Sequence, residues 1–67
     1  MIKGTIKFYH ADKGYGFIAP DDGSRDLYFE QSQFKSTAHQ ITEGLRVSFK
    51  KTLTPKGPQA TEIEVIS

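Results

Sequence analysis

The stretch Gly14-Tyr15-Gly16-Phe17-Ile18 and the later stretch Asp26-Leu27-Tyr28-Phe29-Glu30 decide the fold, and a turn at residues 20–24 joins them. Both stretches are short and rich in aromatic and branched aliphatic residues, which is typical of β-strands. The turn reads Pro-Asp-Asp-Gly-Ser, in which Asp caps its own turn and Gly accepts a positive φ. We therefore predict an antiparallel hairpin here.

Three further segments have the same character, and we predict strands at residues 3–10, 14–19, 26–30, 45–53 and 59–66. Turns are expected at residues 11–13 and 54–58, whereas residues 31–43 show neither strand nor helix period and are expected to form a long polar loop. Five short strands in 67 residues favour a small all-β antiparallel barrel over a two-sheet sandwich. We expect one domain, residues 1–67.

Both faces of the central hairpin carry large apolar side chains, although only one face can point into a single core. A period of two places Ile18, Leu27 and Phe29 in the core and leaves Tyr15, Phe17 and Tyr28 outside. Packing between strands is the ordinary explanation for such rings. An exposed aromatic cluster on a small protein, however, usually marks a binding site.

The neighbours of these rings favour a binding site. Gly14 and Gly16 flank Tyr15, which is typical of a bent or closely approached backbone. Lys7 and Lys13 are expected beside the same face. Flat rings with nearby cations suit single-stranded nucleic acid, because bases stack on the rings while cations follow the phosphates.

Composition limits the alternatives without suggesting this function. Nine Lys and Arg face eight Asp and Glu, a net charge of +1 that is weak for a nucleic-acid-binding protein. The absence of cysteine excludes disulfides and thiolate metal sites. Without a long apolar run or an apolar leader at the N-terminus, the chain is expected to be cytoplasmic and not to bind membranes.

The sequence resembles the cold-shock domain family over essentially its whole length. Residues 13–18, Lys-Gly-Tyr-Gly-Phe-Ile, are similar to the first ribonucleoprotein motif of that family, usually Lys-Gly-Phe-Gly-Phe-Ile. Residues 27–31, Leu-Tyr-Phe-Glu-Gln, stand where the second motif commonly reads Val-Phe-Val-His-Phe. Residues 7–10, 43–49 and 56–60 match further segments, the first being Lys-Phe-Tyr-His for the usual Lys-Trp-Phe-Asn.

This resemblance implies a five-stranded barrel of the oligonucleotide/oligosaccharide-binding (OB) type that binds single-stranded RNA or DNA. Such proteins often prefer pyrimidine-rich strands, melt weak RNA structure as chaperones, and regulate transcription or translation. By position, the resemblance implies stacking on Phe8, Tyr15, Phe17 and Tyr28, with Tyr9 at the edge of the patch. Lys7, Lys13 and Lys56 would meet phosphates, and Gln59 would hydrogen-bond a base edge. Simple alternation sends Phe8 inward with Ile6, whereas the bent first strand of the family exposes it.

Four departures from the family pattern fall on the expected binding face. Phe8 replaces the usual Trp, Glu30 the usual His and Gln31 the usual Phe, while the loop aromatic is missing, with Ala38-His39 nearest in register. Phe34 is expected to replace a core aliphatic residue instead. Glu30 puts a carboxylate where phosphates would pass, and Gln31 removes a stacking ring. We therefore expect weaker binding than in typical members.

Other functions have less support. His10 and His39 are expected in separate loops as solvated side chains, and the acids at residues 21–26 read as turn formers. We predict no catalytic residue, metal site, cofactor or small-molecule substrate. The rival is a protein-interaction module, or a strand-exchanged dimer hinged at the long loop, that uses the same patch. A barrel whose ligand affinity has decayed is a third alternative, and a monomer is the expected state.

Overall fold

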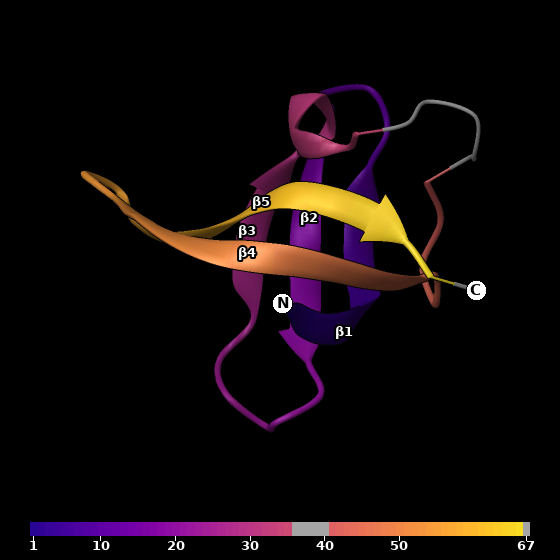
Figure 1. The fold of residues 1–67 in the computed structure, drawn as a ribbon. Helices are drawn as coiled ribbons and strands as arrows, with labels where there is room; N and C mark the ends of the chain where they lie inside the picture. The colour runs from indigo at the N-terminus through magenta and orange to yellow at the C-terminus, as the bar shows by residue number, and fades with distance from the viewer. Residues whose placement is uncertain (36–40, 67) are drawn as a thin grey trace.

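The computed structural model describes residues 1–35 and 41–66, which form five strands and one short 3-10 helix (Figure 1). In chain order these are β1 (Ile2–His10), β2 (Tyr15–Pro20), β3 (Leu27–Glu30), η1 (Gln31–Gln33), β4 (Arg46–Thr54) and β5 (Gly57–Val65). All predicted strands are confirmed, with ends that differ by two residues or fewer. Within the described residues, no helix has the length and apolar character needed to cross a membrane.

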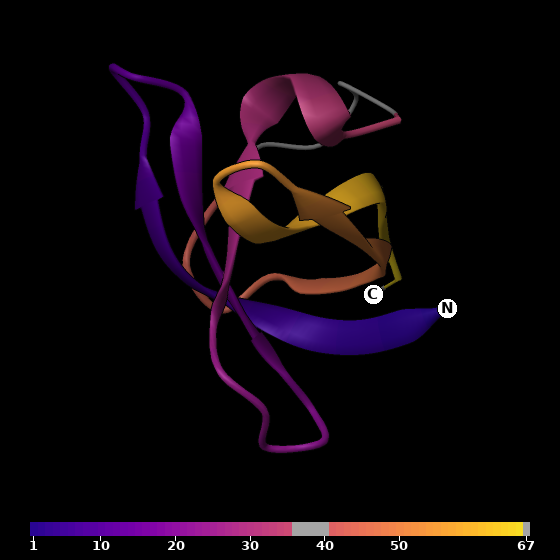
Figure 2. The ribbon, with the colours of Figure 1, turned by 90° about the vertical axis from the view of Figure 1, so that its left-hand side faces the viewer.

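The strands close into a barrel in the order β1-β2-β3-β5-β4. In Figure 1, β4 and β5 cross in front of β1, β2 and β3, and Figure 2 shows the same crossing from the side. Every pairing is antiparallel except that of β3 with β5, which is parallel and joins Tyr28 to Gln59. The expectation of an antiparallel barrel is therefore correct for four of the five strand pairings. The fifth pairing, of β3 with β5, is parallel and closes the barrel.

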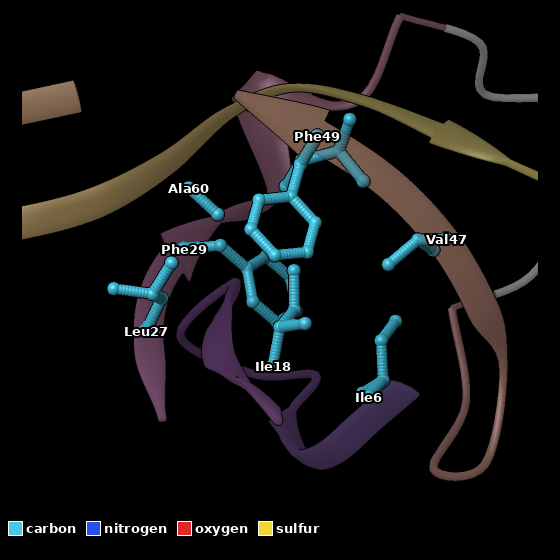
Figure 3. Close-up of a cluster of buried hydrophobic side chains, with 8 residues drawn as sticks. Ile6, Ile18, Leu27, Phe29, Val47, Phe49 and Ala60 are labelled. Atoms are coloured by element: carbon cyan, nitrogen blue, oxygen red, sulfur yellow. The ribbon is translucent and has the colours of Figure 1, made fainter. Parts of the chain in front are cut away.

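One apolar core fills the barrel, and Figure 3 shows its side chains pointing toward one another. The central hairpin contributes Ile18, Leu27 and Phe29, the set that alternation predicted. The other strands contribute buried side chains from β1, β4 and β5, namely Ile6, Val47, Phe49, Ala60 and Ile63. Because this hairpin buries one face only, the side chains of its other face lie at the surface of the barrel.

The segment after β3 is more ordered than the polar loop expected for it. Glu30 leads directly into η1, and Phe34 then forms an isolated parallel bridge with Ile63. The Phe34 ring packs edge-on against Phe29 at 5.7 Å, so it contributes to the core as predicted. Ala38 and His39 lie outside the described residues.

Arg46 joins three parts of the barrel that are distant in sequence. Its Nη1 donates to Thr5 Oγ1 at 2.9 Å and to Asp21 Oδ1 at 2.6 Å, and its Nη2 donates to Asp21 Oδ2 at 2.7 Å. A two-pronged pair of this kind fixes geometry as well as charge. The hydrogen bonds from Arg46 lower the pKa of Asp21 below its usual value of 3.8.

We expect the stability that this pair provides to disappear in acid. Because the pKa of Asp21 is lowered in the folded state, the contribution is complete above the usual value of 3.8 and is lost as the pH falls through the lower folded value. Asp21→Asn should therefore unfold at lower urea concentration than the wild type at neutral pH, and the difference should shrink in strong acid. A difference that stays constant down to about pH 2 would contradict this assignment.

Candidate nucleic-acid interface

Five rings gather on the outer face of β1 and β2 and the neighbouring part of β3. We call this group, Phe8, His10, Tyr15, Phe17 and Tyr28, the aromatic patch. Phe8 and Phe17 expose 39% and 36% of their surface, which is unusual for phenylalanine in so small a protein. Tyr15 and Tyr28 are half-buried. The predicted outward placement of the central rings is thus confirmed.

The strand register arranges these side chains in two rows across the sheet. In the first row, Phe8 lies opposite Phe17, Phe17 opposite Tyr28, and Tyr28 opposite Gln59 of β5. In the second row, His10 lies opposite Tyr15, and Tyr15 opposite Glu30. Neighbouring strands lie about 4.8 Å apart, so each row forms a continuous line of side chains.

The rings of the two rows contact each other in a regular way. Tyr15 is close to parallel with Tyr28, at a centroid distance of 5.7 Å and an angle of 24°. Phe17 stands edge-on to both tyrosines, at 6.4 Å and 6.0 Å. Phe8 lies 6.3 Å from Phe17 and 6.2 Å from Tyr15. The rings therefore form one contiguous aromatic surface.

A β-bulge in β1 places Phe8 in the patch. Ile6 pairs with Ile18, but Phe8 pairs with the adjacent Phe17, so Lys7 is an extra residue in β1. A bulge of one residue inverts the side-chain alternation beyond it. Ile6 therefore points into the core with 1% exposure while Phe8 points outward. This is the placement that the family resemblance implied and that simple alternation opposed.

The same bulge corrects the prediction for His10. We expected a solvated loop histidine, but His10 ends β1 and its ring lies parallel to Tyr15 at 5.6 Å and 16°. It is also 6.4 Å from Phe8. Counting in steps of two from an exposed Phe8 would have found it, so the missing information was the position of the bulge.

Gly16 lies beneath the patch, where β1, β2 and the core come closest. A Cβ on Gly16 would collide with the Phe8 carbonyl oxygen and lie 2.8 Å from the Phe29 ring. Gly14 is needed for a different reason, since its φ of 70° is left-handed. The expected close approach and bend of the backbone are both present.

Tyr9 occupies a different position from the one that the resemblance implied. Its ring stacks on Phe29 of the core at 6.1 Å and 8°, so the ring lies under the sheet and not among the rings of the patch. Its hydroxyl donates to Gln31 Oε1 at 3.2 Å. Gln31, which replaces the expected stacking ring, thus serves as an acceptor for Tyr9.

Charged residues surround the patch. Lys7 lies 3.3 Å from Asp26, with 66% and 36% of the two side chains exposed. An exposed pair of this kind is weak, so Lys7 can exchange Asp26 for another anion. Lys13 is exposed in the turn after His10, where its backbone amide lies 3.4 Å from His10 Nδ1. Among the described residues, the side chains of Lys13 and Glu30 form no ion pair.

Beyond Tyr28 the first row continues into an open depression. Its volume is about 310 Å³ and it is lined by Tyr28, Lys56, Pro58 and Gln59. The parallel pairing of β3 with β5 brings Gln59 beside Tyr28. Lys56 and Gln59 are therefore at the edge of the patch, although they are about thirty residues away from Tyr28 in sequence.

Two lysines away from the patch, Lys50 of β4 and Lys35 after η1, are paired with glutamates of β5. Lys50 lies 3.0 Å from Glu62, and Lys35 lies 3.0 Å from Glu64 and 3.7 Å from Glu62. These contacts raise the pKa of Lys35, chiefly through the hydrogen bond to Glu64, and lower that of Glu62, chiefly through Lys50. Within residues 1–35 and 41–66, no cluster of three His, Asp or Glu side chains could hold a metal ion.

Comparison with known proteins agrees with this geometry. The family model described as the 'Cold-shock' DNA-binding domain matches residues 2–66. Cold shock-like protein CspA of Bordetella pertussis is 42% identical, with 98% of this chain and 100% of the relative aligned. Cold shock-like protein CspE of Escherichia coli is 40% identical, covering 92% of this chain and 91% of the relative.

Similarity of structure extends to more distant sequences. The structure described as drosophila Unr CSD456 superposes with a TM-score of 0.86, covering 98% of this chain and 26% of that one. Its sequence identity is only 23%, so this likeness concerns the fold alone.

We expect the two glycines beneath and beside the patch to differ in their tolerance of a side chain. Gly16→Ala should lower the free energy of unfolding by about 3 kcal/mol or more, because a backbone carbonyl cannot move aside. Gly14→Ala should cost about 1–2 kcal/mol, the cost of a left-handed alanine. Urea denaturation followed by circular dichroism measures both. Equal losses for the two variants would contradict the close approach at Gly16.

Proposed function

The chain belongs to the cold-shock DNA-binding domain family, and from that premise we propose that it binds single-stranded RNA or DNA by stacking bases on the aromatic patch. Members of this family are nucleic-acid-binding proteins and not enzymes. The observation that carries the proposal is the set of five mutually contacting rings on the outer face of one sheet. A stacked base needs a flat apolar surface that is ordered in advance, and these rings provide one.

The cations around the patch suggest a path for the phosphates. Lys7 and Lys13 border the β1 side, and Lys56 borders the opposite side beyond Tyr28. A nucleic-acid strand that follows the first row would pass from Lys7 and Lys13 on the β1 side to Lys56 beyond Tyr28. Its phosphates would meet the lysines while its bases stack between them. Gln59 would then be within reach of the edge of the base that stacks on Tyr28.

We propose that binding is weaker than in typical family members. Each base–ring stack contributes about 1–3 kcal/mol, and Gln31 removes one ring while Phe8 reduces the area of another. Glu30 adds a negative charge at the end of the second row. Lys35 and Lys50 contribute little attraction, since Glu62 and Glu64 cancel their charge.

The wider role follows from the same activity. A protein that holds single strands without strong sequence preference would oppose base pairing, so we propose a role as an RNA chaperone or a regulator of transcription or translation. We propose a cytoplasmic monomer, as the sequence predicted. The alternatives are a strand-exchanged dimer and a protein-interaction module, and the following experiment addresses the second of them.

Binding should weaken steeply with salt. Three lysines that meet phosphates give a slope of about −2 in log affinity against log salt, or roughly a 20-fold loss between about 50 and 200 mM salt. The measurement is fluorescence anisotropy with labelled oligo-dT and oligo-U of about seven nucleotides. Phe17→Ala and Tyr28→Ala should each lose roughly tenfold or more in affinity, because each removes a stacking ring.

Two controls separate stacking from other causes. Tyr28→Phe retains the ring and should bind within about twofold of the wild type. Ile66→Ala removes an exposed apolar side chain outside the patch and should leave affinity unchanged. Absence of binding at high micromolar protein, or binding that ignores salt, would favour the protein-interaction alternative.

The double variant Glu30→His with Gln31→Phe restores the two family residues of the second motif. We expect it to bind oligo-dT at least tenfold more tightly, because it removes a repelling charge and adds a stacking ring. Titration of each single variant beside the double one shows how the two effects combine. Unchanged affinity in the double variant would mean that these positions do not limit binding.

A further inference from the structure

Glu30 ends the second row, and its position relative to the rings suggests a role beyond repulsion. It lies opposite Tyr15 in the β2–β3 register and is exposed. Opposite residues of an antiparallel pair have Cβ atoms about 5 Å apart. A base stacked on Tyr15 would lie parallel to that ring, so its edge would extend over the neighbours of Tyr15 in the sheet.

These neighbours offer few groups that can read a base edge. Phe8 and Phe17 have no polar atom, so the uncharged polar groups beside Tyr15 are the Tyr28 hydroxyl and the His10 ring nitrogens. The His10 ring lies beside Tyr15 in the second row, at a centroid distance of 5.6 Å and an angle of 16°. Within the described part of the chain, the Glu30 side chain forms no hydrogen bond and no ion pair. It is the one carboxylate in the two rows, and it is available to a ligand.

A carboxylate discriminates among bases because it can only accept hydrogen bonds. Thymine and uracil present two carbonyl oxygens on either side of one N–H, and these oxygens would face the negative charge. Cytosine and adenine each present one amino group beside an acceptor nitrogen. Guanine alone presents two adjacent donors, N1–H and the 2-amino group, which match the two oxygens of a carboxylate.

We propose that Glu30 makes the Tyr15 position of this protein selective for guanine over thymine or uracil in a single strand. This inference rests on the proposed function, since the base must first stack on the patch. It departs from the pyrimidine preference that the family resemblance implied. The carboxylate that weakens the attraction for phosphates would thus act as the specificity-determining group of the second row.

The test compares three labelled oligonucleotides of about seven nucleotides: oligo-dT, the same strand with one central guanine, and the same strand with one central hypoxanthine. A single guanine in a thymine strand avoids self-association of guanines. The wild type should bind the guanine strand about tenfold more tightly than oligo-dT. Hypoxanthine lacks the 2-amino group, so its strand should fall between the two.

Glu30→Met removes the charge and the acceptor while keeping a side chain of similar length. It should bind oligo-dT more tightly and the guanine strand less tightly than the wild type. The ratio of its affinities for the guanine strand and for oligo-dT should therefore be close to one. Glu64→Met, outside the patch, makes the same change in net charge and should leave the ratio unchanged. A carboxylate that only repels phosphates would instead give equal gains for both strands in Glu30→Met.

The outcomes separate this inference from the function on which it rests. A wild type that binds all three strands equally, or a guanine preference that survives Glu30→Met, overturns the role of Glu30 and leaves single-strand binding intact. A wild type that binds none of the strands overturns the proposed function itself, and the base preference with it.

Discussion

One constraint governs this protein: 67 residues supply a single small core, and the central hairpin has apolar side chains on both faces. Ile18, Leu27 and Phe29 take the core, so the rings on the opposite side of β2 and β3 must remain at the surface. The cost of exposing them is reduced because they pack against each other. The core and the exposed aromatic patch therefore both follow from the same pair of strands.

Much of this could be predicted from the residues. The strand positions follow from composition and turns, and the division of the hairpin into two faces follows from the period of two. What could not be predicted depends on contacts between distant strands. The bulge at Lys7 changes the face of both Phe8 and His10, and no local pattern marks it. The parallel pairing of Tyr28 with Gln59 likewise depends on how the barrel closes. The resemblance to a family supplied the orientation of Phe8, but His10 has no aromatic counterpart there and was missed.

The departures from the family pattern are not independent of one another. Tyr9 and Gln31 replace two residues that are usually phenylalanine, and in the structure the hydroxyl of one donates to the amide oxygen of the other. A stacking ring at position 31 would leave that hydroxyl without this acceptor. The loss of a stacking ring at position 31 is thus coupled to the hydrogen bond between Tyr9 and Gln31 at the margin of the core. His10 adds a ring next to Tyr15, on the side away from Glu30 in the second row. Relative to the family pattern, the exposed rings therefore lie closer to β1, and the aromatic patch has not simply become smaller.

The basic side chains beside the patch differ from those elsewhere on the barrel in whether they are paired with acids. Lys35 and Lys50 are held by Glu62 and Glu64, whereas Lys13 and Lys56 flank the patch without an ion pair among the described residues. A protein with a net charge of +1 cannot rely on a broad basic surface, because counterion release scales with the number of phosphates neutralised. In the binding mode that we propose, affinity would then come mainly from stacking on the rings, which tolerates any base, and from the few polar groups at the ring edges. In such a site a single carboxylate would have more influence on which base is preferred than it would have beside many cations, each of which would offset part of its charge.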